Sequence, residues 1–260
     1  MKRKGKRDGG FMKKRDNGIL ILVIALLVAA AMTGVQKRQT KRYVDTISSK
    51  VQQTEEKPRV FLTFDDGPSC LTGEYLDILK KHHIKATFFV IGQQVAEMPE
   101  LVRRELKEGH EVGVHTYTHE SCDIYKSSDA YYEDVEKVRS LLKKKFDHEA
   151  VLWRFPWGSA NCYIRSYKDD IISRLRGKNM EYTDWNVSAE DSVGCPDTSS
   201  IMANIRKDAF RVNEPVVLMH DSGSNRATLE SLESIITLFE EKGYEFGTVS
   251  QRKNCCHFGQ

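Results

Sequence analysis

The sequence lacks several patterns that would assign it at once to a class of protein. It has no internal repeat at solenoid or propeller period and no low-complexity tract, which excludes repeat and fibrous architectures. Its six cysteines do not have the paired spacing of a zinc ribbon. What is present is an apolar content of 40% over 260 residues, enough to bury one sizeable core.

Acidic residues are absent between positions 17 and 42, and this absence makes the overall charge misleading. The whole chain carries 40 Lys and Arg against 37 Asp and Glu, a net charge of +3. Residues 1–42 hold twelve of the basic residues and two of the acidic ones, which leaves 28 against 35, or −7, for 43–260. The charge distribution therefore does not support a basic nucleic-acid-binding domain, and we expect no nucleic-acid partner.

The basic residues near the N-terminus flank one apolar segment, residues 18–35. Eighteen helical residues span about 27 Å, close to the thickness of a bilayer core. More Lys and Arg precede the segment than follow it, so the positive-inside rule places residues 1–17 in the cytoplasm as a basic leader. We predict a single-pass transmembrane anchor in the cell membrane. The alternative is a signal peptide cleaved near Ala29–Met32, which would secrete the same domain.

The rest of the chain divides into a linker and one α/β domain. Residues 36–57 are polar and poor in aromatic side chains, so we expect a partly helical linker. From 58 to 252, apolar runs alternate with amphipathic stretches, as parallel strands with crossover helices require. The expected strands are Val60–Phe64, Thr87–Ile91, Glu111–His115, Val151–Phe155, Tyr182–Val187, Pro215–His220 and Tyr244–Val249. The expected helices are Gly73–His83, Pro99–Glu108, Asp129–Phe146, Tyr167–Lys178, Thr198–Phe210 and Ala227–Lys242.

Polar motifs at the strand ends favour a barrel over an open sheet. In a parallel barrel the carboxyl ends of the strands converge on one mouth, whereas an open sheet spreads them along an edge. We therefore predict an α/β fold, a distorted (β/α) barrel of about seven parallel strands, preceded by the transmembrane helix. The motifs at the ends of five expected strands are Asp65-Asp66, His115, Arg154, Asp184-Trp185 and His220.

One carboxylate and two histidines have the composition of a metal site. Asp66 ends an apolar run, and His115 and His119 follow another expected strand at a spacing of four. Either motif alone is weak, because Asp-Asp-Gly-Pro also makes turns and a His pair also arises by chance. Together they supply three zinc ligands and leave positions open for water and substrate. Zinc is the first candidate, and cobalt, manganese, iron and nickel are alternatives for this divalent-metal site.

Five ordered motifs resemble those of the polysaccharide deacetylase family, also called carbohydrate esterase family four. The resemblance covers about residues 58–250 and implies a metal-dependent hydrolase that removes N-acetyl groups from polysaccharide containing N-acetylglucosamine. Because the predicted anchor would place the domain beside the cell wall, we expect the substrate to be peptidoglycan. The motifs are Thr63–Pro68, His115–His119, Arg154–Gly158, Asp184-Trp185 and Leu218–His220.

The resemblance implies roles for the metal and for the catalytic base. Asp66, His115 and His119 would bind the metal, and Asp65 would be the general base. Arg154 would hold Asp65 and favour its charged form. These roles suit amide hydrolysis, because an amide carbonyl is a poor electrophile that needs both a Lewis acid and an activated water.

The remaining motif residues would supply the acid and the substrate slot. His220 would be the general acid for the leaving amine, and Asp184 would orient it and raise its pKa. Trp185 and Leu218 would wall the slot for the acetyl methyl group. Trp157 replaces the Tyr or Gly that is common at its position in the family, and we expect its indole to form a carbohydrate subsite.

Two other functions remain open at this point. One is an O-acetyl esterase acting on xylan, because the same site suits an ester. The other is a metal-holding, glycan-binding domain without turnover. The presence of both Asp65 and His220 argues against the second, since binding alone needs neither a base nor an acid. Whichever of these functions the protein has, we expect it to be a monomer.

The cysteines of an exported domain could form disulfides. Cys70 and Cys122 each follow a site motif by a few residues, and we expect a bond between them. Free thiols are the alternative.

Overall fold

The computed structural model describes residues 37–45 and 57–259 of a chain that divides into two units, Met1–Glu56 and Lys57–Gln260. In the first unit, residues 37–45 are helical. Within the described ranges no helix is both long enough and apolar enough to cross a membrane. The expected leader, 1–17, and the expected transmembrane segment, 18–35, lie outside the described residues.

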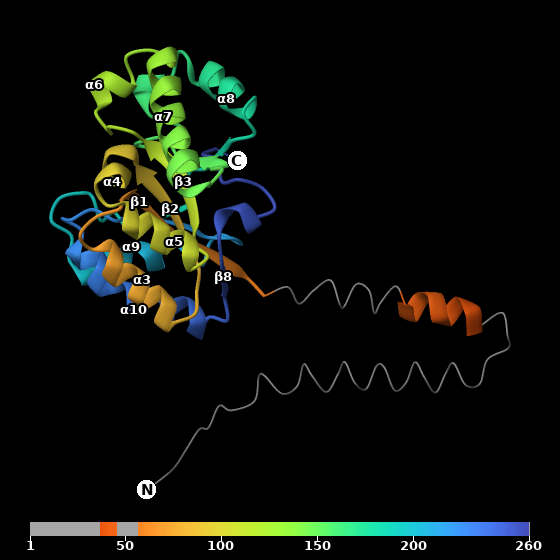
Figure 1. Cartoon of the computed structure of the whole chain (residues 1–260). Helices are drawn as coiled ribbons and strands as arrows, with labels where there is room; N and C mark the ends of the chain where they lie inside the picture. Colours follow the sequence, from red (N-terminus) through yellow and green to blue (C-terminus); the bar gives the residue numbers. More distant parts are fainter. Residues whose placement is uncertain (1–36, 46–56, 260) are drawn as a thin grey trace, which may run out of the picture. The chain divides into compact units, whose positions relative to one another are not determined.

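The second unit is built on a parallel sheet (Figure 1). Its strands follow the order β5-β4-β3-β2-β1-β7-β6, and β8 pairs with β1 beside this path. Every pair in the described sheet is parallel, which confirms the expected α/β fold as a half-barrel of parallel strands. The strands are β1 (Arg59–Gly67), β2 (Thr87–Ile91), β3 (Glu111–Thr116), β4 (Leu152–Trp153), β5 (Glu181–Tyr182), β6 (Val187–Ser188), β7 (Val216–His220) and β8 (Glu245–Gly247).

Helices follow most strands and pack against one another around the sheet (Figure 1). Helix α10 packs on α9 and α3, and α7 packs on α6 and α8. Each expected helix is present, and two short helices, α4 and α6, were not expected. The helices are α3 (Thr72–Lys81), α4 (Gly92–Glu97), α5 (Pro99–Lys107), α6 (Ser121–Ile124), α7 (Ser128–Phe146), α8 (Lys168–Arg176), α9 (Thr198–Asp208) and α10 (Arg226–Glu241).

Local sequence signals explain where these helices begin. Ser127 caps α7 by accepting from the Ala130 N–H, and Asp197 forms a capping box with Ser200 at the start of α9. Pro99 occupies the first turn of α5, where no N–H is needed.

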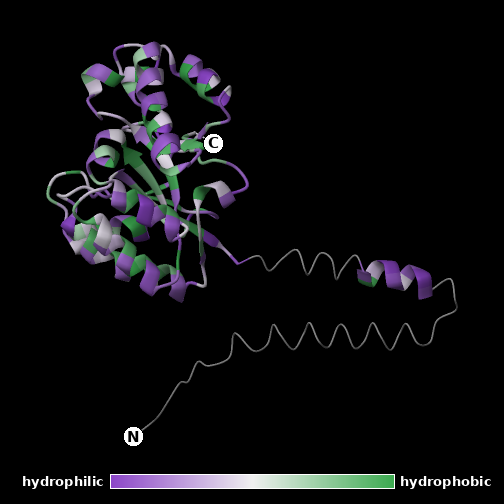
Figure 2. Ribbon diagram, viewed as in Figure 1, coloured by the Kyte–Doolittle hydropathy of each residue, from purple (hydrophilic) through white to green (hydrophobic). Residues whose placement is uncertain are grey.

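The core lies between the sheet and the helices. All five residues of β2 are buried, as expected for a central parallel strand. On α10 the residues repeating at three and four, among them Leu229, Leu232 and Phe239, are buried. Figure 2 shows the same division, with hydrophobic strands inside and hydrophilic outer faces on the helices.

The expected single strand Tyr182–Val187 is wrong, because the chain is interrupted there. The N–H of Asp184 donates to the Cys256 carbonyl at 2.6 Å, and the N–H of Asn186 donates to the Val216 carbonyl at 3.2 Å. The residues on either side form β5 and β6, which are opposite ends of the sheet path. Five Cα steps reach at most about 18 Å, so the sheet must curve until its end strands approach one another.

Candidate active site

Three metal-ligating side chains converge at the carboxyl ends of β1 and β3. The Asp66 Oδ1 atom lies 3.4 Å from His115 Nε2 and 3.5 Å from His119 Nε2. One ligand atom from each residue lies within 4.8 Å of the other two. The sequence therefore predicted correctly which three side chains the fold brings together.

The chemistry of these atoms fits a divalent cation. Among the described residues, the buried Asp66 Oδ1 atom has no hydrogen-bond partner. His115 Nδ1 lies 2.9 Å from the carbonyl of Arg154, which can only accept, so the proton is on Nδ1 and Nε2 keeps its lone pair. Burial holds the pKa of His115 well below its usual range, and neighbouring His119 lowers it further. A neutral imidazole is the form that binds metal.

Three residues around the same place have strained backbone conformations. Asp66 has a φ of 73°, His119 of 60° and Trp157 of 59°, all in the left-handed region. Asp and His enter that region fairly often, but it is an outlier for a side chain as bulky as Trp. Such conformations cost on the order of 1–3 kcal/mol each and persist mainly where function requires them.

Asp65 is held by a buried arginine. The Arg154 Nη1 group donates to Asp65 Oδ1 at 2.9 Å and to Thr63 Oγ1 at 2.7 Å. The other guanidinium nitrogens donate to two backbone carbonyls, Nε to Thr183 at 3.1 Å and Nη2 to Asp184 at 3.0 Å. Burial raises the pKa of Asp65, and the positive charge of Arg154 opposes that rise without cancelling it.

His220, at the end of β7, is held by Asp191. Its Nδ1 lies 2.7 Å from Asp191 Oδ1, and its backbone N–H donates to Asp191 Oδ2 at 2.8 Å. Thr228 Oγ1 donates to the same Oδ2 at 2.7 Å. Burial lowers the pKa of His220, but the hydrogen bond and charge of Asp191, with the charges of Asp65 and Asp66, raise it to about 9. Because Asp191 accepts from Nδ1, the second proton sits on Nε2.

These groups surround one cavity of about 370 Å³, which we call the active-site cavity. Trp157 is 52% exposed, and its ring centroid lies 5.0 Å from that of His119. Trp185 and Leu218, the expected slot walls, and Trp157, the expected carbohydrate subsite, therefore border the same space as the expected metal ligands, base and acid. The lining residues are Asp65, Asp66, His115, His119, Trp157, Trp185, Ser188, Glu190, Ser192, Val193, Leu218 and His220.

Comparison with known proteins decides the family. A model of the polysaccharide deacetylase family matches residues 52–175. A peptidoglycan-N-acetylglucosamine deacetylase of Bacillus cereus is 34% identical over 194 residues, which cover 74% of this chain and 86% of that protein. The chain belongs to the polysaccharide deacetylase family. A second such deacetylase of the same organism is 29% identical over 253 residues, covering 87% of this chain and 90% of that protein.

A solved structure agrees with this family assignment. The catalytic domain of a peptidoglycan N-acetylglucosamine deacetylase from Eubacterium rectale superposes with a TM-score of 0.72 at 31% identity. The match covers 78% of this chain and 94% of that domain. By contrast, the chain spans only 45% of the length of a Listeria monocytogenes relative that is 31% identical to it. The resemblance carried by the five motifs is confirmed.

The prediction that Asp184 orients His220 is wrong. The Asp184 carboxylate accepts from the Ser159 N–H at 2.8 Å, the Ser159 hydroxyl at 2.6 Å and the Phe258 N–H at 3.0 Å. Asp184 lies in the interruption between β5 and β6, whereas Asp191 follows β6, which pairs with the strand carrying His220. A carboxylate in the loop after that neighbouring strand was the signal that could have identified Asp191.

The expected Cys70–Cys122 disulfide is also wrong. All six cysteines, each within the described residues, are free thiols, and both Cys70 and Cys122 are exposed. The Cys70 Sγ atom faces the loop after β7, 3.4 Å from where a Cβ on Gly223 would lie. Cys122 belongs instead to α6, in the segment that follows β3.

Proposed function

We propose that the chain is a metal-dependent hydrolase that removes N-acetyl groups from polysaccharide containing N-acetylglucosamine, with peptidoglycan as the substrate. One observation carries the proposal. A single cavity is bordered by three converging metal ligands, a carboxylate held by arginine and a histidine held by a carboxylate. Binding a glycan would need none of the proton-transferring groups, whereas hydrolysis of an amide needs both a base and an acid.

Asp66, His115 and His119 are the residues that would hold the metal. A bound divalent cation would supply Lewis acidity at the acetyl carbonyl and make water more acidic. Zinc suits one carboxylate with two imidazoles, and cobalt, manganese, iron or nickel would suit the same ligands. The proposed metal is therefore zinc, with those four as alternatives.

Asp65 and His220 would move the protons. Asp65 accepts a proton from the attacking water, and Arg154 keeps the carboxylate oriented towards the cavity. His220 donates its Nε2 proton to the nitrogen of the leaving amine, which departs poorly unless it is protonated. Asp191 holds the opposite ring nitrogen, so the acidic proton is the one on Nε2.

Trp157, Trp185 and Leu218 would bind the substrate. Trp185 and Leu218 wall the slot for the acetyl methyl group, and the exposed indole of Trp157 offers a face for a sugar ring. The relatives named above are peptidoglycan-N-acetylglucosamine deacetylases, which supports the same glycan here.

The proposed location follows from the N-terminal sequence. We propose that residues 18–35 anchor the protein in the cell membrane and that the catalytic domain, 58–252, lies outside as a distorted barrel. In that position the domain would meet cell-wall glycan as a monomer. The support is the apolar length of the segment and the excess of basic residues before it.

Asp191→Asn is expected to lower kcat by about 100-fold and to shift the basic limb of the pH profile. His220 retains its proton up to pH about 9 because Asp191 raises its pKa against the effect of burial. With asparagine that support is lost, and the pKa of His220 should fall below about 7. The measurement is kcat/KM for acetate release between pH about 5 and about 10, because its pH dependence reports the pKa values of the acid and the base in the free enzyme.

Asp184→Asn is the matched control, since it also replaces a buried carboxylate of the same region. Its basic limb should stay near that of the wild type. A basic limb that moves with Asp184→Asn and not with Asp191→Asn would contradict the assignment.

Acetate release tests the function as a whole. The purified domain should be given N-acetylated peptidoglycan, chitooligosaccharide and acetylated xylan, each with and without a chelator. We expect release from the N-acetylated glycans and loss of release with chelator. Faster release from xylan would favour the esterase, and tight glycan binding without acetate from any substrate would favour a non-catalytic domain.

A further inference from the structure

A short segment near the end of the chain fills the interruption between β5 and β6. We call residues Cys256–Phe258 the strap. The Cys256 carbonyl accepts from the Asp184 N–H at 2.6 Å, and the Cys256 N–H donates to Thr183 Oγ1 at 3.3 Å. The Phe258 N–H donates to Asp184 Oδ2 at 3.0 Å. The strap thus supplies the acceptor for the Asp184 N–H, whereas the flanking N–H groups of Thr183 and Asn186 donate to Trp153 of β4 and Val216 of β7.

Side chains hold the strap in place. The His257 ring stacks on Tyr182 of β5 with centroids 4.0 Å apart, and its Nε2 lies 3.0 Å from the Tyr182 carbonyl. The Phe258 ring packs edge-on against Trp185 at 4.8 Å. It also lies so close to Gly158 that a Cβ there would meet it at 2.5 Å.

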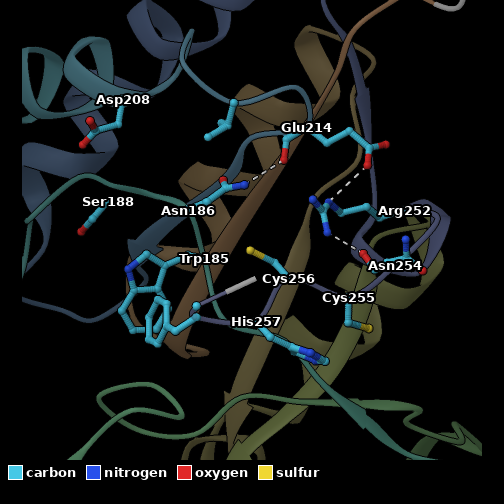
Figure 3. A pocket seen from close by; sticks show the side chains of 13 residues that line it. Trp185, Asn186, Ser188, Asp208, Glu214, Arg252, Asn254, Cys255, Cys256 and His257 are labelled. Atoms are coloured by element: carbon cyan, nitrogen blue, oxygen red, sulfur yellow. Dashed lines mark hydrogen bonds and ion pairs between the residues drawn. The ribbon is translucent and has the colours of Figure 1, made fainter.

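The strap borders a second pocket beside the active-site cavity. This pocket has a volume of about 640 Å³, and Trp185 and Ser188 line both spaces. Figure 3 shows Trp185, Cys256 and His257 along the wall of the second pocket. Trp185 is therefore a shared wall, with the active-site cavity on one side and the strap on the other.

Thr183 and Asp184, which the strap contacts, also accept hydrogen bonds from Arg154. The carbonyls of Thr183 and Asp184 accept from Arg154 Nε and Nη2, and the same guanidinium donates to Asp65. Arg154 is fully buried, and all three of its guanidinium nitrogens donate to protein acceptors. A chain of hydrogen bonds therefore runs from the strap to Thr183 and Asp184, from their carbonyls to Arg154, and from Arg154 to the proposed base, Asp65.

We propose that the strap is a positioning element for the reaction: it fixes the Thr183 and Asp184 carbonyls and thereby orients Arg154 and Asp65. Phe258 and His257 are the positioning residues, and neither touches the reacting atoms. The inference rests on the proposed function for its kinetic effect, but its structural part is independent of activity. It also explains the buried Asp184 carboxylate, which joins the strap to Ser159 of the Arg154–Gly158 motif region.

The test uses the full chain with Phe258→Ala and a chain ending at Cys255. Hydrogen exchange of the peptide spanning 183–186 should accelerate in both variants, because the Asp184 N–H loses its acceptor or its support. We expect kcat to fall about 10-fold in Phe258→Ala and about 100-fold in the shortened chain, since small displacements of a catalytic group cost this much. KM should change less than kcat, because orientation of Asp65 affects the chemical step more than substrate binding.

Two controls separate positioning from simple destabilisation. Phe258→Tyr keeps the aromatic ring and should have a kcat near that of the wild type. Cys255→Ala alters a neighbouring residue outside the strap and should leave kcat unchanged. In an Arg154→Lys background, Phe258→Ala should cost little further, because its effect passes through the guanidinium.

The outcomes distinguish failure of the strap from failure of the proposed function. Unchanged hydrogen exchange at 183–186 would overturn the positioning role whether or not the protein is active. Faster exchange with an unchanged kcat, in a wild-type protein that releases acetate, would overturn it as well, and so would a full multiplicative loss in the Arg154→Lys background. If the wild-type protein releases no acetate from any glycan, the proposed function fails, and the exchange result still decides whether the strap holds the β5–β6 interruption.

Discussion

His115→Ala is expected to remove the metal and to lower acetate release by about 1000-fold or more, because a metal supplies several kcal/mol of transition-state stabilisation. His115 is buried, neutral and oriented by the Arg154 carbonyl, so its Nε2 lone pair is available to a metal. The measurements are metal content, titration with zinc and kcat/KM on N-acetylated glycan. The same titrations with cobalt, manganese, iron and nickel would identify the preferred metal.

His83→Asn is the control for this substitution. His83 is exposed after α3 and has a φ of 57°, a conformation that asparagine accepts readily. The control should retain both metal and activity. A His115→Ala protein that keeps stoichiometric metal and full activity would contradict the ligand assignment, because Asp66 and His119 alone would then suffice.

Periodic segments of the fold were predictable because their signal is local. The run Thr87–Ile91 is entirely apolar apart from its first residue, and it became β2 at the expected bounds. The apolar repeat on Ala227–Lys242 likewise became α10 within one residue at each end. The single strand expected over Tyr182–Val187 failed because partners distant in sequence, Cys256 and Val216, take its hydrogen bonds. No local pattern encodes partners that far away.

The residues of the candidate site likewise divide into those that local sequence predicts and those that depend on strand pairing. Asp66, His115 and His119 were predictable because residue type and position at a strand end suffice to place them at the mouth of a parallel sheet. The carboxylate partner of His220 was not, because choosing between Asp184 and Asp191 requires knowing that β6 pairs with β7. Once that pairing is known, the loop that follows β6 can be placed next to His220.

Asp65, in contrast, was assigned correctly from the motifs as the partner of Arg154. Asp65→Asn is expected to lower kcat by about 1000-fold while the metal stays bound, because asparagine cannot take a proton from water. Its side-chain carbonyl can still accept from Arg154 Nη1, which now lies 2.9 Å from Asp65 Oδ1. Removing one charge of a buried pair can cost about 3–5 kcal/mol of stability, so thermal unfolding must be measured beside kcat.

Asp221→Asn separates the loss of a base from the loss of any buried carboxylate near the site. Asp221 is fully buried, accepts from Ser69 and Thr72, and its N–H donates to the Asp65 carbonyl, yet it does not line the active-site cavity. Its replacement should reduce kcat far less than Asp65→Asn does. If Asp65→Asn kept full activity with metal bound, Asp65 would be only the counter-charge of Arg154. The proton would then have to leave the water by another group of the cavity, and His220, already protonated up to pH about 9, is poorly suited to accept it.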